Sequence, residues 1–183
     1  MKIKSIGFLT AAAIILTIGT ANANMLFDVY AGGTYGFGGY TMFNDDNHIS
    51  KSAMSYGAVL GLDIPLFRIE LEYNYLDSDA ITANLGFVNA YFKLPTPIAK
   101  PYIGAGIGST FDSKYKPSDA QQIDIDDTIT YQGMLGLTFD LPIIPFDIDI
   151  EGRVIYAPDI FEIANTSPDL LQYDGRVKLR YVF

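Results

Sequence analysis

Hydrophobic and polar residues alternate with period two along most of the chain. From Phe67 to Tyr75 every odd position is apolar or aromatic, and the even positions carry Arg, Glu, Glu and Asn. Successive side chains of a β-strand point to opposite faces, so this pattern predicts a strand with one apolar and one charged face. The same alternation predicts eight strands in all, at 26–37, 54–64, 67–75, 84–94, 101–111, 128–141, 146–154 and 173–183.

The connections between these strands alternate in length. After the second, fourth and sixth strands they are short and contain proline, which cannot donate to a sheet ladder. The other connections are mostly longer and polar, at 38–53, 77–83, 112–127 and 157–170. Short turns at one end and long loops at the other are typical of barrels that span a membrane. The sequence therefore predicts an all-β fold, an eight-stranded antiparallel transmembrane β-barrel with an up-and-down meander.

The aromatic residues indicate which face meets lipid. Most of them lie on the apolar faces, with tyrosines near the long loops and Phe67, Phe139, Phe146 and Phe183 near the short turns. Two aromatic belts around an aliphatic band match a bilayer with two interfaces. The interior of an eight-stranded barrel is just wide enough to be filled by side chains. We expect the inward glycines of 102–108 to make room for long Arg, Lys and Glu side chains; a soluble barrel with an apolar lumen is the alternative.

The amino-acid composition excludes several classes of functional site. The 183 residues are 49% hydrophobic and 18% charged, with a net charge of −9 and a pI near 4.4. An acidic chain lacks the basic face that nucleic-acid binding requires, so no nucleic-acid partner is expected. The sequence has no cysteine and a single histidine, His48, which excludes disulfides, thiolate sites and multi-histidine metal sites. We therefore expect no cofactor, no metal centre and no enzymatic activity.

The N-terminal segment has the pattern of a secretory signal peptide. A positively charged start precedes an apolar run at 6–18, and an A-x-A sequence follows at Ala21 and Ala23. The apolar run is shorter than the ~20 residues that a membrane-spanning helix needs. The sequence predicts a signal peptide at 1–23, cleaved after Ala23, and a barrel domain at 24–183.

Charged residues gather on the predicted inward faces. They are Arg68, Glu70, Glu72, Lys93, Asp140, Asp147, Asp149, Glu151, Arg153, Asp174, Arg176, Lys178 and Arg180, with Asp28 and Asp63 near the short turns. The seventh and eighth strands are neighbours, so their opposite charges are expected side by side. Unpaired charges in the lumen would be costly, so we expect hydrogen-bonded ion pairs. Two interpretations stay open: a salt-bridged structural plug, and a narrow gated pore in which the pairs exchange partners.

Other residue clusters indicate less. His48 is expected in the loop 38–53 near Ser50 and Ser52, where a solvated histidine is the simple interpretation and a lipid-modifying His–Ser site the alternative. The loops are acidic, and the run 123–127 offers oxygen ligands for calcium or magnesium without the spacing of a calcium-binding loop. The alternative is an acidic rim that divalent cations bridge to lipopolysaccharide phosphates.

Three segments carry a resemblance to a known family: the strands at 100–108 and 151–156 and the chain end at 180–183. In these segments the chain resembles small outer-membrane β-barrel proteins of the OmpA-like and opacity-type porin superfamily. The resemblance covers about 24–183 and bears on fold and location more than on activity, because such barrels share architecture while their activities differ. It implies that Tyr181 and Phe183 form the signal read by the barrel-assembly machinery, and that no peptidoglycan-binding domain follows.

The expected protein is a monomer, integral to the outer membrane of a Gram-negative bacterium and surrounded by outer-membrane lipid and lipopolysaccharide. The leading interpretation of its function is a structural or surface role, with a polar, salt-bridged lumen and at most weak porin-like permeability. The alternatives are a narrow channel for ions or small solutes, and an adhesin that binds a host-surface ligand through its acidic loops.

Overall fold

The structure, a computed structural model, describes residues 27–44, 47–78, 81–115, 123–125, 128–141, 143–158 and 169–183. The predicted signal peptide and its cleavage residues, Ala21 and Ala23, lie outside these ranges. Among the described residues, no helix is long and apolar enough to cross a membrane.

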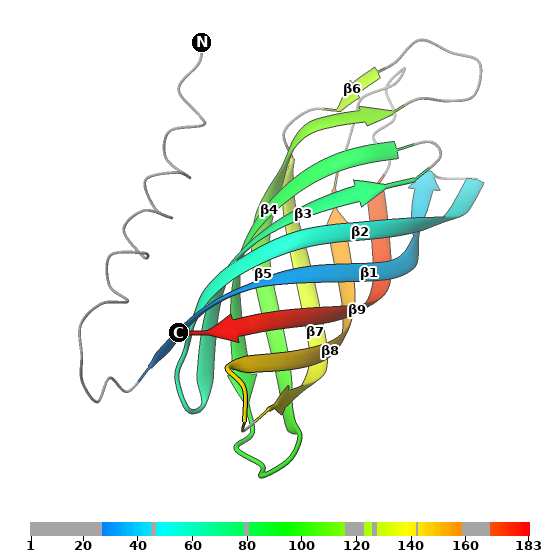
Figure 1. The fold of residues 1–183 in the computed structure, drawn as a ribbon. Helices are drawn as coiled ribbons and strands as arrows, with labels where there is room; N and C mark the ends of the chain where they lie inside the picture. The colour runs from blue at the N-terminus through cyan, green and yellow to red at the C-terminus, as the bar shows by residue number, and fades with distance from the viewer. Residues whose placement is uncertain are drawn as a thin grey trace.

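Eight strands close into one antiparallel barrel (Figure 1). They are β1 (Asp28–Asn44), β2 (Asn47–Asp63), β3 (Phe67–Asp77), β4 (Ile81–Lys93), β5 (Lys100–Tyr115), β7 (Ile129–Asp140), β8 (Phe146–Ala157) and β9 (Asp169–Val182). They pair in the order β4-β3-β2-β1-β9-β8-β7-β5, and β4 pairs with β5 to close the ring. The short β6 (Ile123–Ile125) adds only to the end of β5. The predicted eight-stranded antiparallel meander is therefore confirmed.

The two ends of the barrel differ. The turns β2–β3, β4–β5 and β7–β8 lie together at one end, here called the short-turn end, where the C-terminus also lies (Figure 1). The other ends of the strands, together with β6, lie at the opposite end of the barrel, here called the long-loop end. Each strand therefore runs from one end to the other, as an up-and-down barrel requires.

The strands extend farther toward the long-loop end than the alternation predicts. β1 and β2 stay paired up to Asn44 opposite Asn47, so the predicted loop 38–53 is mostly a β-hairpin, and His48 lies on β2. Strands also shorten the predicted loops at 77–83, 112–127 and 157–170. The predicted strand ends were wrong because apolar and polar residues alternate only along the part of a strand that has lipid on one face. Backbone hydrogen bonds sustain the ladder beyond that part.

The outer face of the barrel is apolar. Its middle band consists of aliphatic side chains, among them Leu135, which exposes 70% of its surface. Aromatic pairs flank this band: the rings of Tyr35 and Tyr56 lie 5.6 Å apart toward the long loops, and those of Phe67 and Phe92 lie 5.6 Å apart toward the short turns. The charged side chains of the same strands point to the lumen. This distribution is the reverse of that in a soluble barrel and suits a lipid environment.

Inward glycines make room for neighbouring side chains. A Cβ on Gly32 of β1 would lie 3.1 Å from Cγ of Arg180 on β9, so the glycine lets this arginine fold into the lumen. On β5, a Cβ on Gly106 would collide with Asn89 of β4 and approach Gln132 of β7. The side chains nearest to the β5 glycines come from the adjacent strands and are uncharged; room for charged side chains across the lumen stays a prediction.

Candidate functional site in the barrel lumen

A network of charged side chains fills the lumen between strands on opposite walls of the barrel. It consists of Arg68, Glu70 and Glu72 of β3, Lys93 of β4, Asp147, Asp149, Glu151 and Arg153 of β8, and Asp174, Arg176, Lys178 and Arg180 of β9; all except the half-buried Asp147 are buried. Every second residue of a strand shares a face, which brings each set into the lumen. We call this set the lumen charge network; it lacks Asp28, Asp63 and Asp140 of the set predicted from the sequence, and these three line the mouth of the barrel.

Glu72 is the centre of the network toward the long loops. Its carboxylate accepts hydrogen bonds from Arg176 and, at 3.0 Å, from Arg153, both of which reach it from the other side of the lumen. The amide nitrogens of Asn89 and Gln132 donate to its other oxygen at 2.9 and 3.1 Å. One buried carboxylate is thus saturated by two guanidinium groups and two amides.

Glu70 and Lys178 form the middle of the network. The Glu70 carboxylate accepts hydrogen bonds from Lys178 Nζ at 2.9 Å and from the hydroxyls of Tyr30 and Tyr91 at 2.6 and 2.8 Å. Lys178 also pairs with Glu151, at 3.1 Å. Because Glu70 lies on β3 and Glu151 on β8, the lysine links two walls of the barrel.

Asp149 organises the network toward the short turns. It pairs with Arg68 at 3.0 Å and with Arg180 at 2.9 Å, and the Thr138 hydroxyl donates to it at 2.7 Å. The two arginines also pair with Asp63, at 3.2 and 3.4 Å. Arg68 and Arg180 thus share two carboxylates at the end of the network nearest to the short turns.

A cluster of buried apolar residues lies in the lumen toward the long loops. It consists of Tyr40, Ala53, Leu76, Ala83, Leu85, Phe87, Ile155 and Ala157, with Leu170 packed against them. The cluster draws on six strands that are consecutive around the ring, from β4 through β1 to β8. We call it the apolar plug. The predicted polar lumen is therefore incomplete, because the extended parts of the strands carry apolar inward residues.

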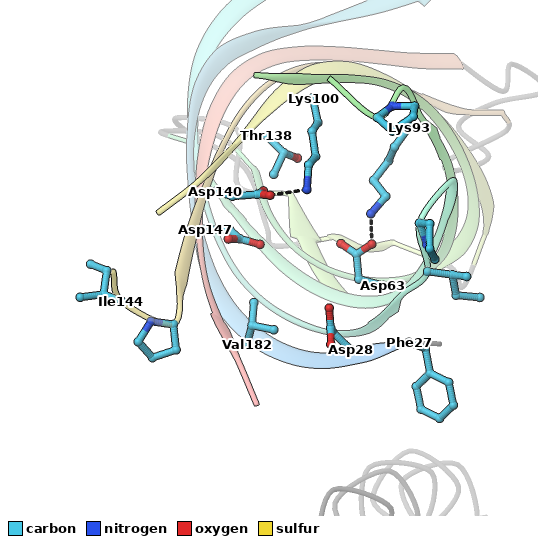
Figure 2. A pocket seen from close by; sticks show the side chains of 14 residues that line it. Phe27, Asp28, Asp63, Lys93, Lys100, Thr138, Asp140, Ile144, Asp147 and Val182 are labelled. Atoms are coloured by element: carbon cyan, nitrogen blue, oxygen red, sulfur yellow. Dashed lines mark hydrogen bonds and ion pairs between the residues drawn. The ribbon is translucent and has the colours of Figure 1, made fainter. Parts of the chain in front are cut away.

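A cavity of about 560 Å³ opens at the short-turn end. Its charged lining residues are Asp28, Asp63, Lys93, Lys100, Asp140 and Asp147, and most of their charged groups point toward the centre of the mouth (Figure 2). Lys93 pairs with Asp63, and Lys100 pairs with Asp140. Thr138 also lines the cavity and accepts a hydrogen bond from Arg68 at 3.1 Å, so the lumen charge network forms its floor.

The sequence analysis missed the uncharged members of this site. Tyr30, Tyr91 and Tyr102 line the lumen, and the guanidinium carbon of Arg68 lies 5.4 to 5.6 Å from the centres of their rings. The Tyr102 hydroxyl donates to Glu151 at 2.9 Å. The signal was present, since Tyr30 shares its strand face with Asp28, and Tyr91 shares its face with Lys93. The sequence analysis assigned no face to these three tyrosines, although parity along the strands places their rings inside.

The residues predicted as oxygen ligands for calcium or magnesium are described only in part. Within the described ranges, no group of three or more His, Asp or Glu residues is arranged to hold a metal ion. Of the acidic run at 123–127, residues 123–125 form β6 and the rest lies outside the described residues. Cation binding by this run stays a prediction.

Comparisons with known proteins define the fold. No protein family matches the sequence, and no curated protein matches it. The structure is similar to that of Neisserial surface protein A (NspA), from Neisseria, with a TM-score of 0.58 and 15% identity over 86% of this chain and 98% of that chain. It is also similar to the N-terminal β-barrel domain of OprF from Pseudomonas aeruginosa, with a TM-score of 0.54 and 14% identity over 82% and 97% of the two chains.

A looser similarity links the chain to the outer membrane enzyme PagL, with a TM-score of 0.44 and 14% identity over 83% of this chain and 97% of that chain. That similarity carries no functional argument. The first two matches establish a shared fold, the eight-stranded barrel of outer-membrane proteins. The resemblance that the sequence indicates is confirmed at this level.

Proposed function

We propose that the protein spans a bacterial outer membrane as a closed barrel with a structural role. In this proposal the barrel anchors the long loops and presents them at the cell surface, and it conducts no solute. The short-turn end faces the periplasm, and the long-loop end faces the exterior, as is usual for such barrels.

The outer face supports the membrane location. Large apolar side chains such as Ile103, Leu135 and Val177 are exposed around the middle of the barrel. A water-soluble protein rarely exposes a continuous apolar surface of this extent. Lipid is the environment in which such a surface is stable, and the closed ring of strands leaves no unpaired edge in it.

The single observation that carries the proposed structural role is the filling of the lumen by side chains. Apart from the half-buried Asp147, the members of the lumen charge network are buried, several of them pair across the barrel, and the apolar plug fills the lumen toward the long loops. Ions would have to displace these side chains. Breaking a buried ion pair costs about 3–5 kcal/mol, and the network contains several pairs that share partners.

Conductance of the purified protein in planar lipid bilayers tests this proposal. We expect no current steps at any applied voltage. A triple variant, Glu72→Ala, Arg153→Ala and Arg176→Ala, removes the ion pairs centred on Glu72. It should also show no current steps, because the apolar plug remains. Co-flotation with lipid vesicles verifies that each protein is inserted.

Unitary current steps from the inserted wild-type protein would overturn the closed-lumen role in favour of a narrow channel. Steps from the triple variant alone would show that the apolar plug does not close the lumen by itself. A protein that fails to float with vesicles at all would overturn the membrane location.

A further inference from the structure

The three short turns repeat a triplet of a charged residue, an aliphatic residue and a proline. The triplets begin at Asp63, Lys93 and Asp140 and read Asp-Ile-Pro, Lys-Leu-Pro and Asp-Leu-Pro. Each of the three charged residues lines the cavity at the barrel mouth. The repeat therefore places a charge inside the mouth at the point where each strand ends.

The residues that follow within these turns are aliphatic and exposed. They are Ile64 and Leu66 in the first turn, Leu94 and Ile98 in the second, and Ile143 and Ile144 in the third. Ile98 exposes 82% of its surface and Ile143 exposes 94%. Turns that face water are normally polar, so six aliphatic side chains at one end of the barrel need an explanation.

These side chains continue the apolar outer face. Ile64 and Ile144 also line the cavity at the mouth, whereas Leu66, Leu94, Ile98 and Ile143 are not among its lining residues (Figure 2). Aromatic rings lie beside the turns: Phe67 contacts Phe92, and Phe146 contacts Tyr181 with ring centres 5.2 Å apart. Among the described residues, exposed apolar side chains thus continue past the aromatic belt into the turns.

Several backbone donors of these turns are bonded within the protein. The Ile64 N–H donates to Phe67 O at 2.8 Å, and the Phe67 N–H donates back at 3.2 Å. The Leu94 N–H donates to Pro101 O on β5, and the Ile144 N–H donates to Leu141 O. The prolines have no N–H at all. Backbone groups that are satisfied internally are the condition for placing a turn where water is scarce.

We propose that Leu66, Leu94, Ile98 and Ile143 form an apolar collar that is inserted among the lipids of the adjacent leaflet. The partner is the acyl-chain and glycerol region of that leaflet. The aromatic belt at this end then lies within the hydrocarbon, and the collar marks its boundary. This inference rests on the proposed membrane location and adds to it the depth at which the barrel sits.

Single cysteines test the collar, because the chain has no native cysteine. Ile98→Cys and Ile143→Cys carry a nitroxide label in the collar, Asp28→Cys carries it in the mouth at the same end, and Leu135→Cys carries it in the middle of the outer face. The proteins are placed in phosphatidylcholine nanodiscs, which leave both ends accessible. Accessibility to a water-soluble nickel chelate and to oxygen, which partitions into lipid, is measured from the relaxation of the label.

We expect severalfold lower nickel accessibility at Ile98 and Ile143 than at Asp28, with oxygen accessibility approaching that at Leu135. Nickel accessibility at the collar equal to that at Asp28, with Leu135 still shielded, would overturn the collar and leave the proposed membrane location intact. Labels at Ile98 and Ile143 that neither reagent reaches would mean that protein covers the turns, which also overturns it. Nickel accessibility at Leu135 would overturn the membrane location itself.

Discussion

At the scale of single residues, the ion pairs of this protein differ in how much water reaches them. Glu72 and its partners Arg153 and Arg176 are buried, whereas the side chains of Lys100 and Asp140 are 35% and 43% exposed. Removing one member of a buried pair leaves a charge without compensation, which costs far more than the loss of an exposed pair. An ion pair therefore contributes more to stability in the lumen than at the mouth of the barrel.

We predict that Glu72→Ala lowers the free energy of unfolding by about 3–5 kcal/mol, because Arg153 and Arg176 lose their shared carboxylate in the lumen. Lys100→Ala at the mouth should cost only about 0–1 kcal/mol. Urea titration of the barrel in lipid vesicles, followed by tyrosine fluorescence, measures both. Equal losses for the two variants would contradict the assignment of Glu72 to the centre of the network.

At the scale of strands, inward and outward glycines have different roles. Gly106 of β5 faces the lumen, where a Cβ would collide with Asn89. Gly133 of β7 is one register position away and faces outward, with no atom within 4 Å of a Cβ placed there. The first glycine is required by packing against a neighbour, and nothing in the described structure requires the second.

We expect Gly106→Ala to destabilise the barrel by about 1–3 kcal/mol, the usual cost of overpacking. Gly133→Ala should be neutral or stabilise by up to about 1 kcal/mol, because alanine restricts the unfolded chain. The same urea titration applies to both variants. A larger loss for Gly133→Ala than for Gly106→Ala would invert the assigned faces.

The elements also show what could be read from the sequence. Alternation identified all eight strands and the lumen side of residues such as Arg68 and Lys178, because lipid and lumen impose opposite polarities on the two faces. Alternation failed to predict the strands where the two faces no longer differ in polarity, as in the hairpin around Asn44 and Asn47. It could not show which partners meet across the lumen, since the pairing of Arg153 with Glu72 depends on barrel closure.

At the scale of the whole molecule, the C-terminus joins the end of β9 to the start of β1. The Phe183 N–H donates to Val29 O at 2.9 Å, and its ring packs on Tyr181 with centres 5.1 Å apart. The ring is otherwise exposed on the outer face. Its side chain therefore adds little to the lumen, which leaves a role in delivery to the membrane as the proposed reason for this residue.

We predict that Phe183→Ala changes the free energy of unfolding by less than about 1 kcal/mol. The amount of folded barrel in the outer membrane of expressing cells should fall severalfold, because the signal for the assembly machinery is weakened. Tyr131→Ala, an exposed aromatic residue on β7, is the control and should leave this amount unchanged. A normal amount of Phe183→Ala barrel in the membrane would contradict the assembly signal.

The ion pairs that cross the lumen have a consequence for how the barrel forms. Adjacent hairpins of the sheet are local in sequence, but the partners Arg68 and Asp149 are 81 residues apart, and Glu72 and Arg176 are 104 apart. Contacts so distant along the chain form late, after the chain entropy has been lost. Before closure, each half of the network would present unpaired charges to lipid, so partly assembled barrels are disfavoured. The lumen therefore makes folding cooperative: closure of the ring and neutralisation of its charges become one event.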